Sequence, residues 1–204
     1  MVGLLTFQLN AKNALRGSSR WGACLGDAVA HSSLTVVDDG RLLGGVASGS
    51  FDREGAPRKK LTLIGNGKIE AFLHNTYTSH AMQTAESSNA SGSARSVPGI
   101  GPSNFLIEPG THTRSELIGD IKQGLLVNRF SGTSNPISGD FSGVAKAAYV
   151  IKNGRIDRPV TGTLVAGNIF ECLQSLSGIS SETERVSSTI LPYVRLEGVS
   201  VTAE

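Results

Sequence analysis

The chain has 204 residues, of which 39% are hydrophobic and 18% are charged. This composition suits a folded protein of one or two domains and excludes a disordered tail. The 19 lysines and arginines nearly balance 17 aspartates and glutamates, which argues against direct electrostatic binding of nucleic acid.

No part of the sequence is typical of an export signal or a membrane span. The apolar stretches fall short of the roughly 18 residues that a transmembrane helix needs, and no basic leader precedes the apolar part of the N-terminus. Two cysteines, Cys24 and Cys172, are too few for a zinc knuckle. We expect both thiols to be reduced and mostly buried. The sequence therefore predicts a cytoplasmic protein with no membrane partner.

A helix is expected over residues 2–15, because its apolar residues recur at spacings near three and four and Gly17 follows as a stop signal. The helix begins almost at the first residue, which indicates the trailing part of a longer protein. Without the preceding part of that protein, its apolar face should be uncovered, and we expect it to pair with a second copy because exposed apolar patches are commonly covered by another chain. The alternative is that the helix folds back on its own sheet and the protein stays monomeric. The residues of this face are Leu4, Leu5, Phe7 and Leu15.

Strands dominate the rest of the sequence. Asn66-Gly67 lies between apolar runs at 60–64 and 68–73, and this dipeptide is typical of a tight hairpin because both residues tolerate positive φ. A second such hairpin is centred on Asn153-Gly154, and its dense apolar residues predict a place in the middle of a sheet. A turn is predicted over 38–40. The other predicted strands cover 33–37, 104–107, 141–151, 155–160, 190–194 and 198–201.

The expected helices are few and short. Thr113 and Glu116 form a capping box, which predicts a helix that ends at about Gln123. Asn168 is typical of a cap and predicts a helix over 169–176. A further helix is expected over 77–86, a long loop over 87–103 and a polar, mobile segment over 180–188. The fold class is therefore α+β, a predominantly antiparallel, barrel-like β-sheet domain with three or four short helices.

The histidines do not form a metal-binding pattern. Zinc-binding helices place two histidines three to five positions apart beside an acidic residue, whereas His74 and His80 are separated by Asn-Thr-Tyr-Thr-Ser. We expect all four histidines, which include His31 and His112, to lie on the surface or in turns. No nucleophile elbow or phosphate-binding loop is present in the sequence either.

Asp52 and Glu54 are the candidates for acid–base catalysis. Two positions apart on a strand, they would share one face. The alternative is a structural role, in which the carboxylates pair with Arg58 and Lys59.

An ordered set of short strings resembles the C-terminal half of the TldD/PmbA family, also described as modulators of DNA gyrase. The resemblance extends from about Arg16 to Val201, and its order and spacing are more specific than any single string. The strings are Phe51-Asp-Arg-Glu-Gly, Leu63-Ile-Gly-Asn-Gly-Lys-Ile, Ser138-Gly-Asp-Phe-Ser, Ile151-Lys-Asn-Gly-Arg-Ile, Pro159-Val-Thr-Gly and Ala166-Gly-Asn.

The resemblance implies a β-rich C-terminal domain over 1–204, without the N-terminal α/β domain that full-length members carry. The family's TldD-like subunit binds zinc through a His-Glu-x-x-x-His helix just upstream of a string that corresponds to Arg16-Gly17-Ser18. Counted back from it, Val2 and Phe7 occupy the histidine positions and Gly3 the glutamate position. These side chains cannot bind zinc or act as a base, and the family's late cysteine is missing from 180–192.

The resemblance therefore implies a non-catalytic TldE/PmbA-like subunit of a zinc peptidase that acts on unfolded peptides. No cofactor is expected in this chain, since zinc would lie in a TldD-like partner, and the other possible partner is a second copy. Two alternatives stay open. One is a free-standing peptide-binding or regulatory module, and the other is a metal-independent hydrolase that uses Asp52, Glu54 or His31.

Overall fold

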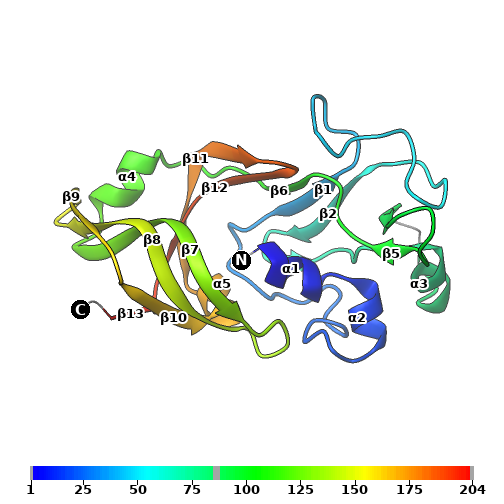
Figure 1. Cartoon of the computed structure of the whole chain (residues 1–204), viewed down its shortest axis with the longest axis horizontal. Coiled ribbons are helices and arrows are strands. Elements are labelled where there is room, and N and C mark those ends of the chain that lie inside the picture. The colour runs from blue at the N-terminus through cyan, green and yellow to red at the C-terminus, as the bar shows by residue number, and fades with distance from the viewer. Residues whose placement is uncertain (1, 85–87, 203–204) are drawn as a thin grey trace. The chain divides into compact units, whose positions relative to one another are not determined.

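The computed structural model describes residues 2–84 and 88–202 (Figure 1). The chain divides into two compact units. Unit 1 comprises Met1–Glu108 and Glu184–Leu191, and unit 2 comprises Pro109–Thr183 and Pro192–Glu204. The predicted α+β class is confirmed, because most pairings are antiparallel and short helices accompany the strands. The described residues contain five helices, one more than the upper end of the expectation.

A six-stranded sheet has the strand order β11-β12-β6-β1-β2-β3, and its strands β6, β1, β2 and β3 lie in unit 1. The strand β12 joins it in parallel through Thr189 and Ile190, which lie opposite Phe105 and Leu106. The buried core residues of this unit are mostly aliphatic, such as Leu5 and Leu63, and include the aromatic side chains of Trp21, Phe72 and Phe105. Its elements are α1 (Val2–Gln8), α2 (Ala11–Leu15), β1 (Val36–Asp39), β2 (Lys60–Gly65), β3 (Lys68–Ile69), α3 (Thr76–Ala81), β4 (Ala90–Ser91), β5 (Gly99–Ile100) and β6 (Phe105–Ile107), with parts of β11 (Leu176–Val186) and β12 (Thr189–Leu196).

Unit 2 contains a sheet with the order β13-β10-β8-β7, and β9 also pairs with β8. Its core consists of Ala145, Ala148 and Val165, covered by larger apolar side chains such as Phe141. The central strand is β8, as the apolar density of its sequence predicts, whereas β9 pairs with no described strand other than β8. The elements are α4 (Arg114–Gly119), β7 (Gln123–Ser134), β8 (Asp140–Lys152), β9 (Arg155–Val160), β10 (Leu164–Asn168), α5 (Ile169–Gln174) and β13 (Ser200–Thr202).

The predicted helix over 2–15 is in fact two helices. The side chain of Asn10 accepts a hydrogen bond from the backbone N–H of Lys12 at 2.9 Å and caps α2, which interrupts the helix. An asparagine competes with the helical backbone in this way more readily than an aliphatic residue. The prediction of an uncovered face is wrong for Leu4 and Leu5, because both side chains are buried.

The hairpin turns and helix caps predicted from the sequence are confirmed. Asn66 and Gly67 have φ of 49° and 77°, and Asn153 and Gly154 have φ of 50° and 75°. These are the two hairpin turns. Thr113 and Glu116 form the capping box of α4, and Asn168 caps α5.

Several boundaries differ from the prediction. The helix after Thr113 ends at Gly119, because Gln123 begins the long strand β7, which was not predicted. The segment 180–188, expected to be mobile, lies largely in β11. The helix expected over 77–86 ends at Ala81, and residues 85–87 lie outside the described part of the chain. The loop over 87–103 contains the short pair of β4 and β5. None of the helices in the described residues has the length and apolar character to cross a membrane.

Candidate functional site

A groove of about 240 Å³ lies within unit 1 beside the helices α1 and α2. Its lining comes from α1, from the residues Asn10 and Asn13, from Leu73, and from the end of β5 with the two residues after it. The lining residues on these segments include Gly3, Thr6, Phe7, Asn10, Leu73 and Ile100.

Hydrogen bonds between distant segments hold the groove in shape. The backbone N–H of Leu73 donates to Leu9 O at 2.8 Å, and the N–H of Ala11 donates to Leu73 O at 3.0 Å. The side chain of Asn10 donates to the carbonyl of Ile100 at 3.4 Å, while Asn13 donates to the carbonyl of Phe7 at 2.9 Å. The break between α1 and α2 therefore holds the lining segments together, because the residues at this break bind segments 73 and 100.

The groove has no ionisable side chain in its lining. Gly3, Thr6 and Phe7 form the wall on α1, where the resemblance places the zinc-binding helix of a catalytic subunit. Structural and catalytic zinc sites use imidazole, thiolate or carboxylate ligands, so these residues do not fit zinc. Across the described residues, no group of three or more His, Cys, Asp or Glu side chains comes together as a metal site. The groove can accept an apolar side chain but offers no general acid or base.

Asp52, the first candidate for catalysis, is buried in a loop rather than placed on a strand. Its Oδ1 accepts hydrogen bonds from the backbone N–H groups of Glu54 at 2.9 Å and Ala56 at 3.0 Å. Its Oδ2 accepts one from the N–H of Ala90 at 2.8 Å. The carboxylate thus organises its own turn and ties it to β4.

Glu54, the second candidate, serves a different segment. Its Oε2 accepts hydrogen bonds from both the N–H and the hydroxyl of Thr76, each at 2.8 Å, at the start of α3. The shared strand face that was predicted for Asp52 and Glu54 is therefore wrong, because the intervening chain turns. Arg58, one suggested partner, instead donates to the hydroxyl of Ser103 at 2.7 Å. A catalytic role for either carboxylate stays a prediction.

A buried polar cluster in unit 1 was not predicted. Asp38 accepts hydrogen bonds from the N–H of Ser103 at 2.6 Å and from its hydroxyl at 3.1 Å, and Asn89 Nδ2 also donates to it. Burial raises the pKa of Asp38, although these hydrogen bonds and the nearby Arg58 act in the opposite direction. Residues 38 and 39 lie in β1 rather than in the predicted turn. The cluster joins β1 to two later segments and is closed to solvent.

The prediction of surface or turn positions holds for three histidines and is wrong for His74. His31, His80 and His112 are exposed, but His74 is only 4% exposed. Its Nδ1 lies 3.2 Å from the hydroxyl of Thr78. Burial lowers the pKa of His74 to about 4, so its ring is neutral at pH 7.

The cysteines are free, as predicted. Cys172 is buried in unit 2, and burial raises the pKa of its thiol. Cys24 is half-buried. A raised pKa disfavours the thiolate, so Cys172 is a poor nucleophile.

The chain is similar to known proteins of one family. The model of the PmbA/TldA metallopeptidase C-terminal domain matches residues 1–203. A protein of Methanocaldococcus jannaschii is 30% identical over 204 residues, which cover 97% of this chain and 48% of that protein. A metalloprotease of Methanothermobacter thermautotrophicus is 30% identical over 169 residues, which cover 82% of this chain and 37% of that protein.

The fold is shared with a solved structure. The crystal structure of TldE from Thermococcus kodakarensis superimposes with a TM-score of 0.89 at 26% identity, covering 98% of this chain and 48% of that chain. The present chain thus spans less than half the length of each of these proteins.

Proposed function

The chain belongs to the PmbA/TldA metallopeptidase family by its C-terminal domain, and on this premise we propose that it is the non-catalytic subunit of a zinc peptidase. Its role is to bind an unfolded peptide and to complete the chamber in which a TldD-like partner, which carries the zinc, cleaves it. The proposal places the protein in the cytoplasm and assigns it no direct contact with nucleic acid.

The wall of the groove on α1 carries this proposal. A catalytic subunit needs histidine and glutamate side chains on this helix, and here the corresponding wall consists of Gly3, Thr6 and Phe7. The apolar residues of the lining, Phe7, Leu73 and Ile100, still suit an apolar side chain of an extended peptide. A volume of about 240 Å³ is below the range of roughly 300–1,000 Å³ that is typical of pockets for drug-sized ligands. The groove therefore favours a role in holding a peptide over a role in cleaving it.

The test is reconstitution with a partner that carries the His-Glu-x-x-x-His helix. We expect the purified chain to contain no stoichiometric zinc and to cleave no unfolded peptide by itself. The assembled pair should contain about one zinc and cleave the peptide, and a chelator should abolish this activity. Zinc bound tightly by the isolated chain, together with cleavage by it, would overturn the proposal.

A matched pair of variants tests the groove itself. Phe7→Glu replaces an apolar residue of the lining with a charged one and should lower peptide cleavage by the assembled pair. Phe51→Glu changes a residue that is 67% exposed and lies outside the groove, so it should leave cleavage unchanged. Equal activity of the two variants, with assembly intact, would show that the groove does not hold the peptide. A partner that cleaves equally well alone would contradict the subunit role and favour a free-standing binding module.

A further inference from the structure

Four exposed cations face one another in pairs on the sheet of unit 2. Arg129 of β7 lies directly opposite Lys146 of β8, and Lys152 of β8 lies directly opposite Arg155 of β9. All four side chains are exposed. We refer to these four residues as the cationic face.

Few carboxylates share the strands of the cationic face. The strands β7, β8 and β9 carry only two acidic residues, Asp140 and Asp157. Asp140 already accepts hydrogen bonds from Ser138 at 2.7 Å and from Asn168 at 2.8 Å. Asp157 lines the open hollow at the β8–β9 turn together with Lys152 and Arg155. Within the described residues, the recorded ion pairs include none of the four cations.

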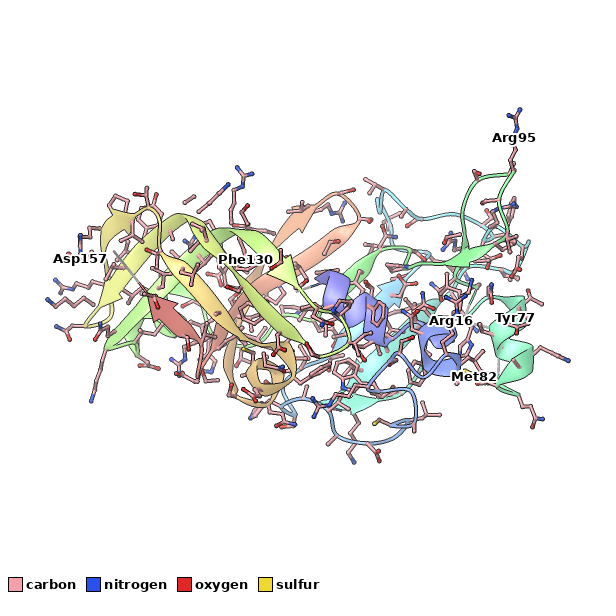
Figure 2. The ribbon with its side chains drawn as sticks, turned by 60° about the horizontal axis from the view of Figure 1, so that its bottom comes forward. Arg16, Tyr77, Met82, Arg95, Phe130 and Asp157 are labelled. Carbon is pink, nitrogen blue, oxygen red and sulfur yellow. The ribbon has the colours of Figure 1, made fainter. Side chains whose placement is uncertain are left out.

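Figure 2 shows Asp157 at one end of the sheet, with nitrogen-tipped side chains projecting outward around it. Arg158 adds a further exposed cation to this end. The local charge is therefore positive although the whole chain has a formal net charge of only +2.

Protection of a sheet edge does not explain this arrangement. Proteins often place a lysine or arginine on an edge strand to prevent pairing with other chains, and Arg129 on β7 could serve that purpose. Lys146 and Lys152, however, lie on β8, which has neighbours on both sides. Like charges directly opposite each other on a sheet are destabilising, so the fold itself gains nothing from these pairs.

We infer that the cationic face is a docking surface for an acidic, extended polypeptide. Carboxylate groups complement guanidinium and ammonium groups, and Lys146 and Lys152 are six positions apart on β8, a separation of at most roughly 20 Å along the strand. Within the described residues, β7 pairs with β8 alone and so presents a free strand edge twelve residues long. A free edge can bind the backbone of an extended peptide, and this property favours a peptide over a nucleic acid. The inference deepens the proposed function and rests on it for the nature of the ligand.

The experiment measures binding of a labelled twelve-residue peptide to the intact chain by fluorescence anisotropy. The peptide carries glutamates at two positions six residues apart, and a second peptide has glutamine at both positions. We expect the acidic peptide to bind more tightly and its affinity to fall as salt is raised. The double variants Arg129→Gln/Lys146→Gln and Lys152→Gln/Arg155→Gln should each weaken its binding by about fivefold, since each removes two surface attractions.

The matched control is Arg41→Gln/Lys68→Gln, which removes the same charge from exposed positions of unit 1. It should leave the affinity within twofold of the parent, and thermal melting should show that all three variants fold. An equal effect of the control, or no effect of the two pairs, would overturn the inference. Tighter binding of a twelve-nucleotide single strand, lost in the same variants, would also overturn it, in favour of nucleic acid. If both peptides bind equally while the assembled zinc peptidase remains active, only the preference for acidic peptides is wrong and the proposed function stands.

Discussion

The rings of Phe130 and Phe141 meet edge to face, with centroids 5.9 Å apart and planes inclined at 87°. Phe130, labelled in Figure 2, also covers the cross-strand pair of Gly132 and Gly143. An ideal Cβ on these glycines would come within 2.9 Å and 2.8 Å of its ring. One aromatic side chain therefore fills the space that two glycines leave empty on adjacent strands.

Phe130→Ala should lower the free energy of unfolding by about 2 kcal/mol, because it removes the ring contact and uncovers the glycine pair. The residue is 44% exposed, so a loss smaller than that of a fully buried phenylalanine is expected. Urea unfolding provides the measurement. Phe51→Ala, at a position that is 67% exposed, should cost less than about 0.5 kcal/mol. Equal losses for the two variants would contradict the bridging role of Phe130.

Glycine is required at positions 67 and 154 for two reasons, the backbone conformation and the lack of room for a Cβ atom. Each has positive φ, and a Cβ would come within 2.4 Å of the carbonyl oxygen of Ala30 and of Gly119, respectively. Gly67→Ala and Gly154→Ala should therefore each destabilise by about 2–3 kcal/mol.

Gly198→Ala separates these two causes. Gly198 has φ of 75° but no atom within 4 Å of an added Cβ, so its substitution should cost only the conformational part, about 1 kcal/mol. Thermal melting of the three variants gives the comparison. If Gly67→Ala or Gly154→Ala melts like Gly198→Ala, the close backbone contact at that turn does not add to the cost of the substitution.

His74 should make the protein less stable in mild acid. Its pKa is about 4 in the folded chain against about 6.5 when unfolded. A lowered pKa means that the unfolded state binds the proton more readily, so the stability is complete above pH 6.5 and is lost as the pH falls toward 4. From pH 7.5 to pH 5 the loss from this residue is about 2 kcal/mol.

Urea unfolding at both pH values tests this, with His74→Gln showing a smaller loss than the parent and the exposed-site variant His80→Gln behaving like the parent. The raised pKa of Asp38 changes the stability in the opposite direction as the pH falls. Because this effect is common to all three proteins, the comparison isolates the effect of His74. An NMR titration of the folded parent gives a second readout that does not depend on the variant folding. A His74 midpoint near 6.5 would refute the prediction.

Asp52 should behave as a structural acceptor. Asp52→Ala leaves the N–H groups of Glu54, Ala56 and Ala90 without their carboxylate partner, at a cost of about 3 kcal/mol or more. Asp52→Asn keeps one carbonyl oxygen and should cost about half as much. Glu54→Ala, at an exposed site, should cost about 1 kcal/mol. If Asp52→Asn abolished peptide cleavage by an assembled pair without lowering stability, the acid–base role would be favoured instead.

The sequence by itself determined those features whose partners lie a few positions away. Asn66-Gly67, Asn153-Gly154 and the Thr113–Glu116 box were predicted and are confirmed, because positive φ and capping depend on neighbouring backbone groups. The same holds for the cap at Asn168. The ordered strings of the family also belong to this level, because they can be read along the chain without knowledge of what packs against what.

Tertiary structure decided the rest. Asp52 binds the N–H of a residue 38 positions later, and Asp38 binds a residue 65 positions later, so neither partner could be inferred from local spacing. The strand β7 mixes polar residues, glycines and apolar residues on an exposed edge, and only pairing with β8 makes it a strand. His74 differs from the three exposed histidines solely in what surrounds it. Burial and opposition across a sheet depend on contacts between distant segments, and for that reason the polar cluster and the cationic face emerged only in the folded chain.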